Sequence, residues 1–138
     1  MERPSSTAKA LRAAGLRPTE QRIALHQLLF SEGHRQVTAE ELHAEVLARG
    51  IVLSVATIYN ALNDFTEAGL VRVLAVEGAR TWFDTNTADH HHFFVEGKGE
   101  IHDIDNDSIS IANLPDPPEG FEIANVDVVI RVRPLTNQ

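Results

Sequence analysis

Cysteine is absent from this chain, and methionine, tryptophan and tyrosine each occur once in 138 residues. Without thiols the chain cannot form a disulfide, a four-cysteine zinc site or a cysteine nucleophile. Several classes of enzyme and of metal site are excluded together. Any bound metal ion must be held by His, Asp, Glu or Gln side chains.

Long hydrophobic runs are missing as well. No stretch of about eighteen apolar residues occurs, the length that a membrane-spanning helix needs. The first residues, 1–6, lack the apolar region of a signal peptide. We therefore expect a cytoplasmic protein. Hydrophobic residues still form 43% of the chain, enough for the core of one ordinary domain or of two small ones.

Positive charge is scarce in the second part of the chain. Residues 85–138 hold three Lys or Arg against ten Asp or Glu, whereas residues 1–84 hold nine against ten. Within residues 1–30 the balance is five against two, although the whole chain has a net charge of −8. A basic first segment can contact phosphates, while an acidic second part favours cations. We predict two domains, residues 1–84 and residues 85–138.

Four helices are predicted before residue 70. Apolar residues recur at helical spacing in each, and a glycine marks the end of each one. Thr38 and Glu41 form a capping box at the start of the third helix, and Ser54 begins the fourth. The predicted helices cover residues 7–14, 18–33, 38–50 and 54–69.

The pattern then changes to alternation and predicts a hairpin, with strands at residues 70–76 and 80–83. Three helices followed by a hairpin are the order of a winged helix-turn-helix, whose last helix enters the major groove of DNA. The alternative is a small helical domain that binds nothing. The outer face of the fourth helix favours DNA, because it carries uncharged hydrogen-bonding groups, namely Ser54, Thr57, Tyr59, Asn60 and Asn63. Phosphate contacts are expected from Arg12, Arg17, Arg22 and Arg80.

The second part of the chain is predicted to form a small sheet. Its strands are residues 92–95, 100–104 and 126–132, and the last alternates aliphatic residues on one face. Residues 113–120 contain three prolines and cannot form a helix interior. Because so little covers this sheet, a second copy of the chain is the economical partner. A two-fold dimer also suits a palindromic DNA site.

Ligand-type side chains gather where the two domains meet. Three of the seven histidines are consecutive, His90 to His92. On a strand, His90 and His92 point to one face and His91 to the other. With Asp84 before them and Asp103 after them, they form a set of nitrogen and oxygen ligands for zinc, ferrous iron or manganese. The alternative interpretation is a solvated polar strand end.

Several motifs together resemble the ferric uptake regulator (Fur) family. They are Leu16-Arg-Pro-Thr-Glu-Gln-Arg22, Val37-Thr-Ala-Glu-Glu-Leu42, Ser54-Val-Ala-Thr-Ile-Tyr-Asn-Ala-Leu62, Ala68-Gly-Leu70 and Asp89-His-His-His92. The consecutive histidines, the missing cysteines and residues 117–124 are similar to the iron response regulator (Irr) branch of alphaproteobacteria. This resemblance implies an α+β fold, with an N-terminal winged helix and a small C-terminal α/β dimerisation domain. It also implies a homodimeric repressor that couples iron and haem status to transcription.

The family's regulatory metal site falls on Asp84, His90, His92 and Asp103 by this resemblance. The family's loop histidine aligns with Gln36, so either Gln36 or the nearby His34 is the candidate fifth ligand. A second metal site in the dimerisation domain is expected to be absent, because the family places a histidine in the last strand, where this chain has Val126 and its neighbours. The family's four-cysteine zinc site is absent.

Two further interpretations concern the same stretch. Haem could be an effector bound by His90, His91 or His92, since haem iron accepts imidazole ligands. A metal with open coordination positions could also support hydrolysis. No nucleophile motif or glycine-rich phosphate loop accompanies it, so we expect no enzyme. A sensor of manganese or of peroxide stress is the other regulatory alternative.

Overall fold

The computed structural model describes residues 4–74, 80–88 and 91–136. Their contacts divide the chain into two compact units, residues 1–87 and residues 88–138. The sequence-based boundary between residues 84 and 85 lies three residues earlier. The fold is α+β, as predicted, and among the described residues the helices lie in the first unit apart from one short 3-10 turn. None of the described helices is long and apolar enough to cross a membrane.

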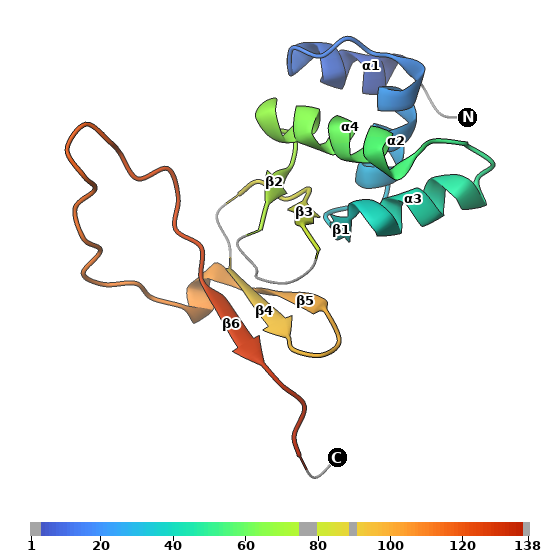
Figure 1. Ribbon diagram of the computed structural model, residues 1–138. Helices are drawn as coiled ribbons and strands as arrows, with labels where there is room; N and C mark the ends of the chain where they lie inside the picture. The colour runs from blue at the N-terminus through green and yellow to red at the C-terminus, as the bar shows by residue number, and fades with distance from the viewer. Residues whose placement is uncertain (1–3, 75–79, 89–90, 137–138) are drawn as a thin grey trace. The chain divides into compact units, whose positions relative to one another are not determined.

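The first unit contains the four predicted helices, with some shifts at their ends. They are α1 (Pro4–Ala13), α2 (Glu20–Phe30), α3 (Ala39–Ala48) and α4 (Val55–Glu67). Each N-terminus from α2 onward has a side-chain cap: Thr19, Thr38 and Ser54 accept hydrogen bonds from backbone N–H groups of the first turn. The capping box of Thr38 and Glu41 is confirmed. Figure 1 shows the four helices gathered above three short strands.

Glycines with positive φ end these helices where the sequence placed the stops. Gly50 has φ 78° and Gly69 has φ 82°, a conformation that costs glycine little. The residue after each glycine donates its backbone N–H to a carbonyl in the last turn of the helix. Ile51 donates to Val46 and Leu70 donates to Phe65, each over 2.9 Å. The helices therefore begin and end through local chemistry.

The strands of the first unit form a small antiparallel sheet of order β1-β3-β2. They are β1 (Gln36–Thr38), β2 (Arg72–Val73) and β3 (Trp82–Asp84). The hairpin of β2 and β3 is the predicted wing, although its turn at residues 75–79 lies outside the described residues. Strand β1 was not predicted. It is only three residues long and is defined by its pairing with β3.

The core of the first unit joins all four helices to its sheet. Its fully buried members include Leu11, Leu25, Leu42, Leu62 and Phe65, and Phe83 of β3 is 1% exposed. This packing fixes the direction of α4 and of β3. The outer face of α4 and the neighbour of Phe83, Asp84, are thereby positioned.

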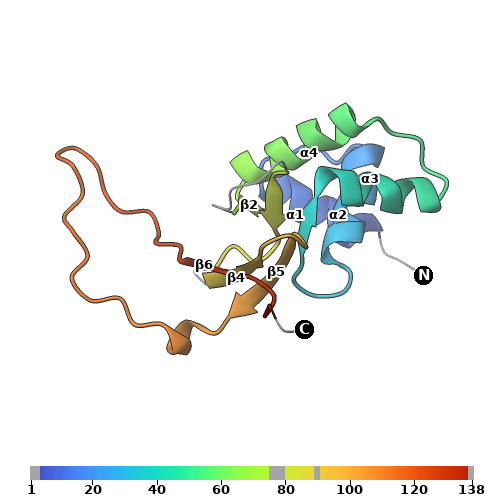
Figure 2. The same cartoon turned by 60° about the horizontal axis from the view of Figure 1, so that its bottom comes forward.

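The second unit is a three-stranded sheet of order β5-β4-β6. Strands β4 (His91–Val95) and β5 (Glu100–Ile104) form an antiparallel hairpin, and β6 (Val129–Val132) pairs with β4 in parallel. Strand β6 is shorter than the predicted 126–132. A short 3-10 turn, η1 (Asn106–Ser108), follows β5 and was not predicted. Figures 1 and 2 show the connection from η1 to β6 as a wide loop that stands away from its own sheet.

Candidate metal centre and nucleic-acid interface

The β4–β5 hairpin brings two of the predicted metal ligands together. The turn at residues 96–99 sets the register so that His92 lies directly opposite Asp103. Directly opposite residues share one face of the sheet. The Nε2 atom of His92 is 3.3 Å from Oδ1 of Asp103, and the His92 side chain is 1% exposed while that of Asp103 is 50% exposed. A buried imidazole therefore meets a carboxylate that reaches solvent.

His91 has a different role from His92, as expected for adjacent residues on a strand. Its Nδ1 atom accepts a hydrogen bond from the backbone N–H of Val128 over 3.0 Å. The N–H of His92 in turn donates to the carbonyl of Val128 over 3.1 Å. An accepting Nδ1 requires a neutral ring whose proton is on Nε2. His91 thus holds the residue that precedes β6 beside β4.

Two further histidines, His90 and His102, lie close to His92 in the sequence. His90, a predicted ligand for metal and haem, lies outside the described residues. His102 is 60% exposed, and its Nε2 atom is 3.4 Å from a carboxylate oxygen of Glu100. It makes this contact while its neighbour Asp103 faces His92.

Asp84 belongs to the first unit, at the end of β3, and is 0% exposed. Its Oδ1 atom accepts a hydrogen bond from the N–H of Asn86 over 2.9 Å. Because β3 is the central strand, Asp84 has a cross-strand neighbour on each side, Gln36 in β1 and Arg72 in β2. Gln36 is therefore beside Asp84, whereas the other candidate for the fifth ligand, His34, is an exposed residue before β1.

Sequence reasoning missed Arg72. Strand β2 has only two residues, so its register with β3 could not be fixed from the sequence. The available signal was the predicted hairpin, in which a basic residue near the start of one strand is opposite the acidic end of the other. Arg72 is the residue opposite Asp84.

The side chains on the predicted DNA-contacting face of α4 differ in their exposure and in their contacts within the protein. The hydroxyl of Ser54 caps the helix and lies 2.9 Å from that of Thr57. Tyr59 is half-buried, and its ring centroid is 6.3 Å from that of Phe83. Asn60 is exposed, and so is Asn63 one turn later. Asn60 and Asn63 are thus exposed side chains of this face that can reach a ligand.

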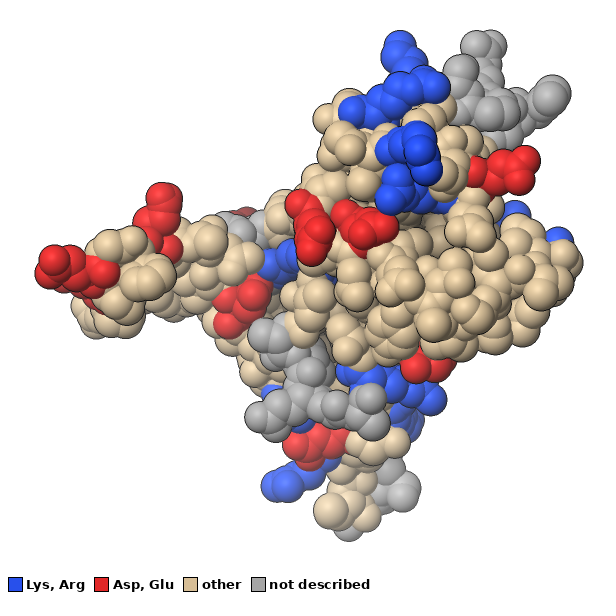
Figure 3. Space-filling view, turned by 45° about the horizontal axis from the view of Figure 1, so that its top comes forward, with Lys and Arg blue, Asp and Glu red and all other residues tan. Residues whose placement is uncertain are grey.

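The predicted phosphate-binding arginines also differ from one another. Arg12, Arg17 and Arg80 are exposed. Basic side chains gather over the N-terminal helices in the upper part of Figure 3. Arg22 instead joins α2 to α4, since its guanidinium donates to Asp64 over 3.1 Å and to the carbonyl of Arg17 over 3.0 Å. Both partners are partly exposed, so this ion pair contributes little, about 0–1 kcal/mol.

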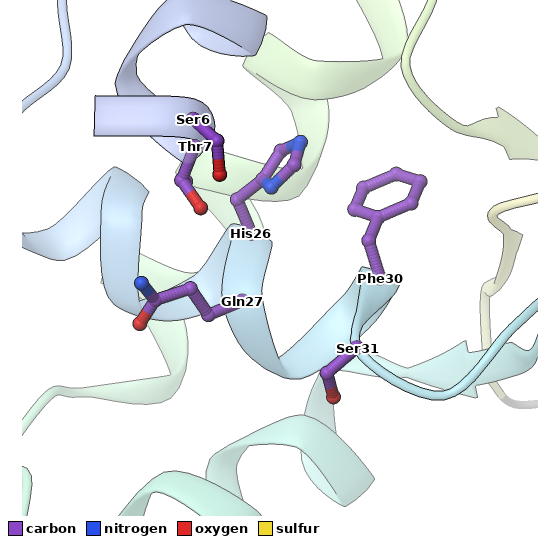
Figure 4. Close-up of a pocket in the computed structure, with 6 residues that line it drawn as sticks. All are labelled: Ser6, Thr7, His26, Gln27, Phe30 and Ser31. Atoms are coloured by element: carbon purple, nitrogen blue, oxygen red, sulfur yellow. The ribbon is translucent and has the colours of Figure 1, made fainter. Parts of the chain in front are cut away.

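A cavity of about 290 Å³ lies between α1 and α2. Figure 4 shows the ring of His26 between the hydroxyl groups of Ser6 and Thr7 and the ring of Phe30. The centroids of His26 and Phe30 are 4.4 Å apart, and burial lowers the pKa of His26 below its usual value. His26 is therefore a packing residue of the helical unit.

An ion pair between Arg35 and Glu45 holds α3 in place. Arg35 donates to both carboxylate oxygens of Glu45 and to the carbonyl of Leu28. The hydrogen bonds that the guanidinium donates to Glu45 raise the pKa of Arg35, which stays charged. The backbone N–H of Arg35 also donates to the hydroxyl of Thr85 over 2.9 Å. Arg35 thus links α2, α3 and the segment that follows Asp84.

Comparison with known proteins identifies similar chains. The peroxide-responsive repressor PerR of Staphylococcus epidermidis is 39% identical over 95 residues, 69% of this chain and 63% of that protein. PerR of Staphylococcus aureus is also 39% identical over 95 residues, which cover 69% of this chain and 64% of that protein. The match therefore spans slightly less than two thirds of these curated relatives. Both of these relatives are peroxide-responsive repressors.

Solved structures extend the similarity to most of the chain. The ferric uptake regulator of Vibrio cholerae has a TM-score of 0.73 at 25% identity, over 91% of this chain and 97% of that one. The regulator of Pseudomonas aeruginosa, solved with manganese, has a TM-score of 0.70 at 27% identity, over 91% and 96%. The model of the ferric uptake regulator family matches residues 13–131. The chain belongs to the ferric uptake regulator family.

Proposed function

We propose that this chain is a metal-responsive transcriptional regulator that binds operator DNA as a homodimer. The observation that carries the metal response is the buried His92 imidazole 3.3 Å from Asp103. It occurs in a chain whose first unit has the order of a winged helix-turn-helix. We infer that this one chain combines a metal-sensing site with a DNA-binding unit.

The proposed metal ligands are Asp84, His92 and Asp103, which offer one imidazole and two carboxylates. His90 is the fourth proposed ligand, and either Gln36 or His34 the fifth. Nitrogen and oxygen donors without thiolate suit zinc, ferrous iron or manganese. Asp84 belongs to the first unit and the other two described ligands to the second.

The proposed DNA interface is the exposed face of α4 together with the exposed arginines of α1, the segment before α2, and the wing. Asn60 is proposed to read base edges, with Ser54, Thr57 and Tyr59 beside it. Arg12, Arg17 and Arg80 are proposed to contact phosphates, which carry no sequence information. Arg22 is also a proposed phosphate contact. Its guanidinium already donates to Asp64, so we expect it to act mainly through its positive charge and by supporting the main chain at Arg17.

The proposal of a dimer is supported by the composition of the second unit. Ile104 is its only buried hydrophobic residue among those described. Its long loop leaves Leu114, Phe121 and Ile123 exposed, and Ile130 of β6 is 38% exposed. A sheet with so little core of its own needs a partner to cover it. A second copy of the same unit is the proposed partner.

Metal analysis combined with DNA binding tests this function. Protein purified without chelator should contain a divalent ion, and operator affinity should fall when the ion is removed. Asp103→Asn should lower the metal content, since it removes the carboxylate beside His92. His102→Gln, on the same strand but with its ring at Glu100, is the matched control and should keep the ion. Equal metal contents in the two variants would exclude the proposed site.

Iron and haem are the proposed effectors, on the basis of the resemblance to the iron response regulators. His90, His91 and His92 are the proposed haem ligands. Ligation through Nε2 of His91 would require its proton to leave that atom, so the bond from Val128 would be lost. Haem titration followed by absorbance should then give a weaker complex with His91→Phe than with His102→Gln. Identical spectra and affinities would remove His91 from the ligand set.

A peroxide or manganese response is the second candidate. Two curated relatives are peroxide-responsive repressors, and one similar structure was solved with manganese. Operator release by peroxide from iron-loaded but not from manganese-loaded protein would favour a peroxide sensor. Release by haem alone would favour the iron and haem response.

A further inference from the structure

Asp84 stands between a neutral and a positively charged neighbour in the sheet of the first unit. Its cross-strand partners are Gln36 on β1 and Arg72 on β2. Side chains that lie directly opposite one another leave the same face of a sheet, with Cβ atoms about 4.5–5.5 Å apart. The guanidinium of Arg72 is therefore within reach of the Asp84 carboxylate.

The burial of these residues makes that proximity important. Asp84 is 0% exposed, and the Nε atom of Arg72 is itself buried. A carboxylate removed from water is costly unless it meets a compensating charge or several hydrogen bonds. The N–H of Asn86 donates a hydrogen bond over 2.9 Å, which is one of the interactions that Asp84 makes.

We propose that Arg72 is an internal counter-cation of Asp84 that competes with the metal ion and sets the affinity of the metal site. This inference rests on the proposed role of Asp84 as a metal ligand. In the metal-free protein Arg72 compensates the buried carboxylate. A divalent ion at Asp84 meets a fixed positive charge on the neighbouring strand, and the repulsion weakens its binding.

A positive charge beside the metal site would explain how the site releases its ion when the metal concentration falls. A sensor needs a site that loses its ion when the ion becomes scarce, and a resident positive charge lowers affinity without removing any ligand. Gln36, the neighbour on the other side, adds an amide and no charge. The two neighbours therefore weaken the site in different ways, one by repulsion and the other by offering a poorer ligand than imidazole.

The test compares Arg72→Gln with Arg49→Gln. Arg49 is an exposed arginine at the end of α3, so both variants lose one positive charge from the same unit. Titration of zinc and of manganese should show binding about tenfold tighter, or more, in Arg72→Gln than in Arg49→Gln. Arg72→Lys keeps the charge and should stay near the wild-type affinity. Equal affinities for Arg72→Gln and Arg49→Gln, or weaker binding by Arg72→Gln, would overturn the inference.

The metal-free proteins provide a second readout. Arg72→Gln should have a lower melting temperature than Arg49→Gln, because Asp84 loses its counter-charge. Asp84→Asn added to Arg72→Gln should restore part of that loss, since the unpaired carboxylate is removed. Additive losses in the double variant would contradict the pairing.

Asp84→Asn alone separates this inference from the proposed function. If it abolishes metal binding while Arg72→Gln changes nothing, the metal site stands and only the role of Arg72 is wrong. If Asp84→Asn keeps the wild-type metal affinity, the proposed site itself fails.

Discussion

Burial decides what each histidine side chain of this protein can do. His92 is 1% exposed and faces a carboxylate, His102 on the same hairpin is 60% exposed, and His26 packs on Phe30 within the helical unit. The sequence grouped His92 and Asp103 among the candidate metal ligands, and the hairpin places them directly opposite each other. The sequence could not predict the partners of Arg22 or Arg72, since Asp64 lies 42 residues from Arg22 and the register of β2 depends on tertiary pairing.

His26 predicts an acid-sensitive contribution to stability. Burial lowers its pKa in the folded protein, so between that pKa and about 6.5 the unfolded chain binds more protons. The free energy of unfolding should therefore fall as pH drops below about 6.5. His26→Phe keeps an aromatic ring against Phe30 and removes the titration.

Chemical denaturation at about pH 7.5 and about pH 5.5 checks this prediction. His26→Phe should lose less stability between the two conditions than the wild type. The same loss in both proteins would show that the acid sensitivity comes from other groups.

Elements that are specified by local chemistry were predicted well, and those that depend on partners were not. The starts of α3 and α4 follow from Thr38 and Ser54, and their ends from Gly50 and Gly69. Strand β1 exists only through its pairing with β3, and β6 is shorter than its aliphatic alternation indicated. A strand at a sheet edge is defined by its neighbour, which a single sequence does not display.

The capping box gives a prediction at this scale. Thr38→Ala removes the side-chain acceptor of the Glu41 N–H and should lower the free energy of unfolding by about 1 kcal/mol. Thr38 is 0% exposed, so water cannot replace the lost acceptor easily. Thr136→Ala, at an exposed position after β6, is the control and should be close to neutral. Equal effects would mean that the cap does not stabilise α3.

The exposed face of α4 gives a second prediction. Asn60→Ala should cost about 1–3 kcal/mol on the preferred operator and reduce the preference over other sequences. Arg17→Ala should weaken binding to all sequences alike and lower the salt dependence by about one unit of slope. Fluorescence anisotropy on selected and scrambled DNA at several salt concentrations measures both. If Asn60→Ala weakened binding to all sequences alike, α4 would not read bases.

At the scale of the whole molecule the two units are built differently. The first has a buried core that includes residues of every helix, whereas the described part of the second contributes only Ile104 to the buried hydrophobic residues. The first unit can therefore be stable as a single copy, and the second depends on what covers it. This contrast also explains why the sequence predicted helices better than the terminal strand.

Ile130→Asp tests the proposed dimer. Ile130 is 38% exposed in the single chain, so aspartate should be tolerated within its own sheet. In a dimer interface the same charge would be buried without a partner and cost several kcal/mol, about 3–5. Light scattering should show monomers, and operator affinity should fall with dimerisation. Leu135→Asp, at a 73% exposed position beyond β6, is the control and should remain dimeric.

The parallel pairing of β6 with β4 has a consequence for the order of events during synthesis. The β4–β5 hairpin can form as soon as residue 104 has left the ribosome, but β6 is made after the whole connecting loop. Parallel pairing across such a loop forms late, since distant segments must be brought together first. The helical unit and the hairpin are then already folded when the last strand arrives. A nascent chain would acquire its DNA-binding fold before it could complete the sheet through which it is proposed to find its twin.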